Sequence, residues 1–356
     1  MSSSGDTEFW NLIQRILQFV CCTSSLVLNG TLILLIFTKS PKHIGFYKYL
    51  MAYICVFEFL YSIWDIIVEP RVHSYQAAFV VFRSDNDFDQ DKDFLLIITY
   101  CGCFGFSLAV FGVHFIYRYG AVNKEFGDRY LSGFKVSILF IIPLFYGAWW
   151  TLVCLLFYRS DVYCDNYMER TVMEEYGVDV RNTSYLCVTF HRMNEFGVEV
   201  PDMNYIGPMF FCFFMIGSSI ICVFYFGYQC YAVISKSIKT SNAISKTTKH
   251  LQRQLFNALV AQTIIPLILM YIPIGILVIF PMINYKLFFK TNFVASTIAA
   301  YPAIDPLPNM IIIKCYRRAI LDFLAKIFGN QKLKYLAKVG TSVARSLEQR
   351  ISKTDS

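Results

Sequence analysis

Charged residues are scarce in this chain. Asp, Glu, Lys and Arg make up only 16% of its 356 residues, whereas 56% are hydrophobic and 17% are aromatic. Packed soluble domains carry about 25% charged residues, so this chain has too little polar surface to stay dispersed in water. The scarcity excludes an ordinary soluble protein and indicates an integral membrane protein.

Motifs of catalysis are missing as well. The sequence contains no nucleotide-binding loop, metal-ligand cluster or nucleophile motif. Asp65 and Asp305 lie in apolar runs, as the acids of an intramembrane aspartyl protease do, but their expected depths differ and neither has the flanking residues of that class. We therefore expect no enzymatic activity, no cofactor and no metal.

A basic block is also missing, although the net charge is +7. The Lys and Arg residues stand in short gaps between apolar runs, which is typical of membrane proteins rather than of nucleic-acid-binding proteins. The first ten residues are polar and acidic and lack the positively charged segment of a secretory signal. We expect no nucleic-acid partner, and we expect the first apolar run to act as its own insertion signal.

Seven long apolar runs are present. A spanning helix needs about 20 mostly apolar residues, and such runs lie at roughly 11–38, 47–69, 94–117, 134–158, 204–235, 254–282 and 291–313. The sequence therefore predicts an all-α membrane protein with a seven-transmembrane helix bundle. We assign residues 1–325 to the bundle domain and residues 326–356 to a basic cytoplasmic tail.

The charges outside these runs predict an orientation. Of the 32 Lys and Arg, 22 fall in or beside the gaps after the first, third and fifth runs and in the tail from Lys314, while nine fall in the other gaps. Acidic residues are distributed the opposite way, five against sixteen. Because Lys and Arg collect on the cytoplasmic side, we expect the N-terminus outside and the tail inside.

The gap between the fourth and fifth runs carries two further expectations. Cys164 and Cys187 stand together in this external loop, where disulfides persist, and we predict that they pair. Cys101 or Cys103 in the third run is the competing partner. Asn182 begins an Asn-Thr-Ser glycosylation acceptor in the same loop.

Acidic residues inside the runs are costly in lipid and should face the interior of the bundle. At about 1.5 Å per residue, Glu58 and Asp305 are expected at similar depth, and we interpret them as an intramembrane polar switch. Asp65 lies nearer the external surface, where it either reaches water, the interpretation we favour, or lines a ligand cavity. Aromatic residues are further pocket candidates: Trp64, Tyr100, Phe104, Trp149 and Trp150.

Prolines are concentrated in the last two runs, among them Pro266, Pro273, Pro302 and Pro306. Proline removes a backbone hydrogen bond and bends a helix. These residues are therefore either static kinks or hinges of the two helices that move. The internal repeats of many transporters do not accompany them.

The segment after the seventh run has an apolar stripe made of Ile320, Leu321, Phe323, Leu324, Ile327 and Phe328. Basic residues lie elsewhere on the same helical pattern. The segment 316–328 is therefore predicted to be an amphipathic helix on the inner membrane leaflet. A weaker stripe over 333–351 fits either a second such helix or a flexible basic tail near anionic lipid.

Several stretches resemble a known family. They are Lys48-Tyr49-Leu50-Met51, His114-Phe115-Ile116-Tyr117-Arg118-Tyr119, Arg253-Gln254-Leu255-Phe256-Asn257-Ala258-Leu259-Val260, Gln262-Thr263-Ile264-Ile265-Pro266, Tyr301-Pro302-Ala303-Ile304-Asp305-Pro306-Leu307 and Tyr316-Arg317-Arg318. With the pattern of spans, they cover almost the whole chain up to residue 325. The chain resembles the nematode serpentine chemoreceptors, in particular the class that includes the olfactory receptor for diacetyl.

The resemblance implies a GPCR-like bundle and a G-protein-coupled chemosensory receptor of the olfactory type. The ligand would be a small odorant or pheromone-like molecule, and the partner a heterotrimeric G protein. The receptor would reside in the plasma membrane of a sensory neuron cilium. A ligand-gated channel or transporter of seven spans is the alternative, but the seven-span odorant channels of insects have the N-terminus inside.

The resemblance also implies a coupling site. Arg118, with His114 one turn before it and Tyr119 after it, corresponds to the arginine that ends the third span of rhodopsin-like receptors. Tyr117 stands where those receptors have an acid, which leaves open how the resting state is held. An acid-free loop supplies the other coupling candidates, which are Lys246, Lys249 and Arg253.

Overall fold

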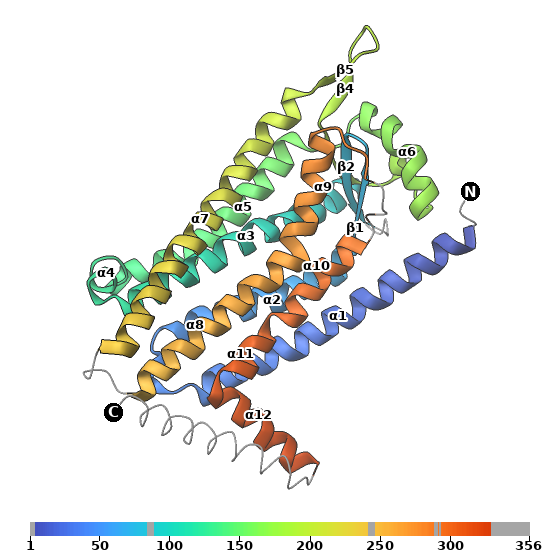
Figure 1. The fold of residues 1–356 in the computed structure, drawn as a ribbon. Coiled ribbons are helices and arrows are strands. Elements are labelled where there is room, and N and C mark those ends of the chain that lie inside the picture. The colour runs from blue at the N-terminus through green and yellow to red at the C-terminus, as the bar shows by residue number, and fades with distance from the viewer. Residues whose placement is uncertain (1–3, 84–88, 241–245, 288–290, 292, 329–356) are drawn as a thin grey trace.

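Long apolar stretches fold as helices because a helix satisfies every backbone polar group within one segment. The computed structural model describes residues 4–83, 89–240, 246–287, 291 and 293–328. Figure 1 shows the long helices side by side, with the strands and α6 at the end of the bundle where the N-terminus lies, and with α4 and α12 at the other end.

The helices of the bundle and the helix after it are α1 (Ser4–Lys39), α2 (Tyr47–Val68), α3 (Gln90–Val122), α5 (Ile138–Phe157), α7 (Met203–Thr240), α8 (Lys246–Pro266), α9 (Ile272–Met282), α10 (Phe293–Ile304), α11 (Pro306–Ile312) and α12 (Lys314–Ile327). The helical elements between them are η1 (Lys42–Ile44), α4 (Lys124–Tyr130), η2 (Gly133–Ser137), α6 (Val162–Tyr176), η3 (Val180–Asn182) and the π-helical turn η4 (Leu267–Tyr271). The strands are β1 (Pro70–Tyr75), β2 (Ala78–Arg83), β3 (Tyr185–Thr189), β4 (His191–Met193) and β5 (Glu199–Pro201).

Six helical stretches of the described chain are long and apolar enough to cross a membrane. They are Glu8–Lys39, Tyr47–Val68, Gln90–Val122, Gly133–Phe157, Met203–Lys236 and Thr248–Met282. Each one overlaps one of the first six predicted spans. The helical membrane fold expected from the sequence is confirmed.

The seventh predicted span is divided into α10 and α11, with Asp305 at the break. Pro306 causes this division, because proline has no N–H to donate to the carbonyl of Pro302 four residues earlier. That carbonyl accepts instead from Asn29 Nδ2 at 2.9 Å and from Ser25 Oγ at 3.1 Å, both on α1. The two short helices together still extend over the predicted span.

The sixth span is one helical run made of α8, η4 and α9. The π-helical turn begins directly after Pro266, and Pro273 lies in the first turn of α9. A proline cannot donate the backbone bond that continues an α-helix, and a π-turn is a common local solution. The two candidate hinge prolines therefore flank the only π-helical segment of the described chain.

A three-stranded antiparallel sheet covers one end of the bundle, and the sequence did not predict it. The strands are ordered β1-β2-β3, with Val80 opposite Cys187 in the register. Alternate residues point to opposite faces of a sheet. Phe79, Val81 and Val188 pack on the bundle, while the intervening residues of β2 and β3 pack under α6. The strands are thus buried on both sides.

The covering sheet is fastened to its surroundings. A disulfide joins Cys164 of α6 to Cys187 of β3. Arg83 at the end of β2 forms a buried ion pair with Asp93 in the first turn of α3. The N-terminal part of α1 reaches the same region, where Asn11 Nδ2 donates to the carbonyl oxygen of Tyr176 at 3.2 Å. We call this assembly of β1, β2, β3 and α6 the cap.

At the opposite end, α12 forms a helix of 14 residues after the bundle. Its apolar residues Phe323 and Ile327 are exposed and Tyr316 is buried, with the Tyr316 hydroxyl 2.7 Å from Ser40 Oγ. The helix itself agrees with the predicted amphipathic segment, and its position on a membrane surface stays a prediction. The weaker stripe over 333–351 lies outside the described residues.

The cap disulfide gives a first prediction. Unreduced peptides of the purified protein should contain a pair joined through Cys164 and Cys187 when analysed by mass spectrometry. Closing a separation of 23 residues stabilises the fold by about 3 kcal/mol in the chain-entropy model. Cys164→Ser and Cys187→Ser should each lower the surface level, and the double variant should lower it no further. Two free thiols, or a bridge to Cys101 or Cys103, would contradict the pairing.

Candidate functional site

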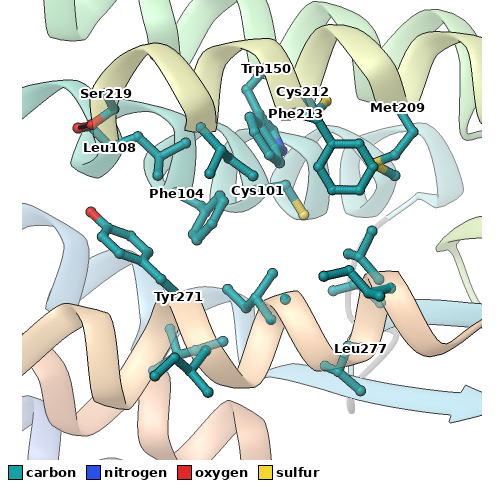
Figure 2. Close-up of a pocket in the computed structure, with 18 of the residues that line it drawn as sticks. Cys101, Phe104, Leu108, Trp150, Met209, Cys212, Phe213, Ser219, Tyr271 and Leu277 are labelled. Carbon is teal, nitrogen blue, oxygen red and sulfur yellow. Dashed lines mark hydrogen bonds between the residues drawn. The ribbon is translucent and has the colours of Figure 1, made fainter. Parts of the chain in front are cut away.

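A cavity of about 420 Å³ lies inside the bundle beneath the cap. Most of its walls come from α3, α5 and α7 on one side and from η4, α9 and α10 on the other, and Tyr61 of α2 and Thr263 of α8 also line it. Figure 2 shows Met209, Phe213 and Ser219 of α7 facing Tyr271 and Leu277 across it. Cavities of roughly 300–1,000 Å³ are typical of small-molecule sites.

The roof of the cavity is made of strand residues. Val72, Phe79, Val81, Leu186 and Val188 line it from the three strands of the cap, and all five are buried. They can do so because the same pleat directs one set of side chains into the bundle and the other set toward α6. The cap therefore closes the outer end of the cavity with apolar side chains.

The lining is almost entirely apolar. None of the residues that line the cavity in the described chain is charged. Several hydroxyl groups that reach it are already bonded to backbone carbonyls: Tyr271 to Ser107 at 3.0 Å, Thr263 to Leu259 at 2.9 Å, and Ser219 to Leu108. The cavity thus offers apolar contact surface and few free polar groups, which suits an uncharged ligand.

The predicted pocket residues divide into two groups. Tyr100 and Phe104 of α3 line the cavity, as does Trp150 of α5. Trp64, Asp65 and Trp149 are not among the lining residues, although Tyr61 of α2 is. Placing these three in the pocket was wrong, and Asp65 contacts Gln18 of α1 instead.

Asp65 also does not reach water, contrary to the favoured expectation. The residue is 2% exposed, and its Oδ2 accepts from Gln18 Nε2 at 2.8 Å and from Cys22 Sγ at 3.2 Å. The sequence did not show that the side of α1 that carries these donors packs against α2. Asp65 therefore links α1 to α2.

Most of the lining residues on α7 and on the sixth span were missed. On α7 they recur as Met209, Cys212, Phe213, Ile216, Ser219, Ile220 and Val223. Steps of three and four residues place such positions on one face of a helix. This helical spacing was the available signal. In a membrane span, however, the lipid-facing side and the cavity-facing side are both apolar, so the spacing could not tell them apart.

A polar cluster lies below the cavity, where the sequence analysis placed its intramembrane switch. The structure buries Glu58 of α2 and Asp305 next to each other, with the two residues 1% and 0% exposed. Tyr301 of α10 donates its hydroxyl to Glu58 Oε1 at 3.1 Å.

Gln262 connects this cluster to the sixth span. Its Nε2 donates to Asp305 Oδ2 at 2.7 Å, and its Oε1 accepts from Asn309 Nδ2 at 3.0 Å. Gln262 lies on α8, nine residues before Tyr271 at the cavity wall. The break in the seventh span and the helix that carries the cavity wall are therefore hydrogen-bonded to each other.

Arg118 lies at the end of the bundle opposite the cap and is 1% exposed. Its Nη2 donates to the backbone carbonyl of Gln252 on α8 at 2.9 Å, and its guanidinium lies 5.0 Å from the ring centre of Tyr47. Tyr47 also contacts His114, with its hydroxyl 3.4 Å from Nδ1. A carbonyl of the sixth span thus binds Arg118 in the place of an adjacent acid.

The other coupling candidates lie around Arg118. The half-buried Tyr119 accepts a hydrogen bond from Asn123 and packs against Phe226 of α7. Arg253 is exposed near the start of α8, and Lys249 is half-buried one turn before it. The side chain of Lys246 lies outside the described residues.

Comparisons with known proteins identify relatives along most of the chain. The family model described as "Serpentine type 7TM GPCR chemoreceptor Str" matches residues 14–321. "G-protein coupled receptor str-217" of Caenorhabditis elegans is 35% identical over 88% of this chain and 90% of its own length. "Serpentine receptor class r-10" is 31% identical in C. elegans and 28% in Caenorhabditis briggsae, each over 89% of this chain and 92% of the relative.

The polar cluster gives a second prediction. Glu58→Ala leaves the buried Tyr301 hydroxyl without its acceptor, so it should lower the free energy of unfolding by about 1–3 kcal/mol. Glu58→Gln keeps an oxygen for Tyr301, so its effect should be smaller. The measurement is the thermal melting temperature of the purified protein. Equal melting of Glu58→Ala and the unaltered protein would contradict the assigned contacts.

Proposed function

Because the chain belongs to the Str family of serpentine seven-transmembrane G-protein-coupled chemoreceptors, we propose that its apolar cavity binds a small, uncharged chemical cue. Binding activates a heterotrimeric G protein at the opposite end of the bundle. The observation that carries this function is the sixth span, because one continuous helical run contributes both to the cavity wall and to the contact with Arg118.

The ligand acts first on the outer half of the sixth span. Leu267 and Tyr271 of the π-turn and Gly275 of α9 line the cavity. A π-turn has weaker helical geometry than an α-helix and is a common site of functional bending. A ligand that favours one shape of this turn shifts the position of α8 relative to α9, with Pro266 and Pro273 as the hinges.

The displacement of α8 reaches two partners. Gln262 moves against Asp305 and Asn309 of the seventh span, and the carbonyl of Gln252 moves away from Arg118. A ligand shifts such an equilibrium by its difference in affinity for the two states. Loss of the Gln252 contact uncovers Arg118, and the polar switch of Glu58 and Asp305 adjusts its hydrogen bonds to the new position of Gln262.

The G protein binds at the end that carries Arg118. The distribution of Lys and Arg supports a cytoplasmic position for that end and an external position for the cap. The first turns of α8 contribute positive charge through Lys246, Lys249 and Arg253, which attracts an acidic surface or a terminal carboxylate of the partner. α12 lies on the inner leaflet beside this site.

The family resemblance supports the biological setting. The receptor resides in the plasma membrane of a sensory neuron, in the cilium, and serves olfaction and chemotaxis through an odorant or pheromone-like ligand. Asn182 is exposed beside α6, in the part of the cap that faces away from the bundle, and carries a glycan. The relative named G-protein coupled receptor str-217 supports coupling to a G protein.

The cavity gives a third prediction. A Cβ added at Gly275 would meet no atom within 4 Å, so the backbone there accepts a side chain, and Gly275→Leu adds bulk at a residue that lines the cavity. Replacing a helical glycine also favours the helix by about 0.5–1 kcal/mol. We expect a normal surface level and a roughly tenfold or greater loss of potency for agonists found in a panel of volatile and soluble small molecules.

Gly207→Leu on α7 is the matched control. A Cβ added at Gly207 also meets no atom within 4 Å, but the residue does not line the cavity. Its dose response, read by a calcium or cyclic-nucleotide reporter, should match that of the unaltered receptor. Equal potency of Gly275→Leu and Gly207→Leu would show that the agonist binds elsewhere.

Arg118 gives a fourth prediction. Arg118→Ala should remove the agonist-dependent response while surface level and ligand binding stay within about twofold, because the residue lies far from the cavity and helix propensity favours alanine. Arg129→Ala changes an exposed arginine at the same end and should retain the response. A full response in Arg118→Ala at normal surface level would assign Arg118 a structural role only.

A further inference from the structure

The cavity lining contains residues that are also exposed on the side of the bundle. On α7 these are Ile220 and Phe224, which are 44% and 74% exposed. On the sixth span they are Leu267, Ile272 and Ile279, which are 42%, 49% and 45% exposed. A residue that both lines a cavity and reaches the surface lies at an opening. We call these five residues the side opening.

The side opening lies at the level of the membrane. All five residues belong to the spanning stretches Met203–Lys236 and Thr248–Met282. Apolar side chains on the outside of such stretches contact lipid tails rather than water. The side opening therefore connects the cavity to the hydrocarbon region of the bilayer.

Helix packing explains why the side opening exists. α7 packs against α3, α5 and α8, whereas α9 packs against η4, α10 and the strands β1 and β2. The two helices thus have their main neighbours on opposite sides of the cavity. Figure 2 shows α7 and the sixth span separated by the side chains that line the cavity.

The outer end of the cavity is closed in contrast. The five strand residues of the roof are at most 8% exposed. Adjacent strands are joined by the antiparallel ladder, and the disulfide between Cys164 and Cys187 fastens β3 to α6. α9 and α10 pack directly against β2 and β1. A molecule coming from the external water would have to separate hydrogen-bonded strands.

The lining of the cavity restricts its ligand. The lining has no charged residue in the described chain, and several of its hydroxyl groups are already bonded to backbone carbonyls. The cavity therefore fits an uncharged, apolar molecule.

We propose that the ligand is an uncharged, apolar molecule that dissolves in the bilayer and enters the cavity sideways through the side opening between α7 and the sixth span. This inference rests on the proposed function of the cavity. Its ligand collects in the membrane around the receptor before binding, and the cap excludes water instead of admitting the ligand.

Association and dissociation rates distinguish a residue on the entry route from a residue of the binding site. Bulk placed in a passage slows both binding and release, whereas bulk that only narrows the site weakens binding and speeds release. The variants are Ile220→Trp and Ile272→Trp, alone and combined. Matched controls are Ile221→Trp and Ile268→Trp, which alter neighbouring exposed residues that do not line the cavity.

The probe is 1-aminoanthracene, a linear, uncharged fluorophore whose emission rises in apolar surroundings. Stopped-flow mixing with the full-length receptor in lipid nanodiscs gives the association rate, and dilution gives the dissociation rate. The Gly275→Leu receptor in the same nanodiscs supplies the signal of probe dissolved in lipid. Both rates should fall roughly tenfold, equal to a barrier higher by about 1.4 kcal/mol, in the combined variant and stay unchanged in the controls.

The other possible results contradict either the route through the side opening or the cavity as the binding site. Unchanged association in the combined variant, or slower association without slower dissociation, overturns the route through the side opening and leaves the cavity as the ligand site. Equal slowing in the controls also overturns that route. A probe signal that is the same in the unaltered and Gly275→Leu receptors overturns the cavity as a site for apolar ligands, and the route with it.

Discussion

The carbonyl oxygen of Pro302 cannot be satisfied within its own helix, because Pro306 has no N–H to offer it. In the hydrocarbon region no water is available, so the partner has to come from another helix. Ser25 and Asn29 of α1 provide it. This requirement fixes α1 against the seventh span and leaves Asp305 at the break, where Glu58 and Gln262 reach it. Because Pro306 lacks an N–H, residues of α1, α2, the sixth span and the seventh span thus meet at the break between α10 and α11.

Gln262 extends this constraint to the sixth span. α8, η4 and α9 form one continuous helical run that contacts the cavity at one end, the polar cluster near its middle and Arg118 at the other end. Pro266 and Pro273 flank the π-turn within this run. A structure with the same helices but a rigid, unbroken sixth span would have no comparable way to connect its two ends.

The sequence predicted the parts that depend on local composition. Long apolar stretches located the spans, and burial cost indicated that Glu58 and Asp305 face inward, since an isolated carboxyl group in lipid is expensive. The cap strands were not foreseen, because the residues on their outer face are buried only by α6, and the sequence alone did not show that α6 packs there. The partner of Arg118 is a backbone carbonyl, which every residue possesses, so no sequence motif could reveal it. The burial of Asp65 depended in the same way on Gln18, whose side of α1 the sequence left open.

The lack of fixed charge in the cavity has a consequence for how this receptor distinguishes molecules. A hydrophobic site separates ligands mainly by fit, and one methylene group changes binding by about 1–3 kcal/mol. Ligands that differ by one methylene group would therefore differ gradually in affinity, and none would be fully excluded. Under the proposed function, we expect a single exchange among Phe104, Trp150 and Leu277, which line the cavity, to shift the ligand size that binds best. Tuning of this kind alters which molecule is sensed while the polar cluster and the coupling end stay unchanged.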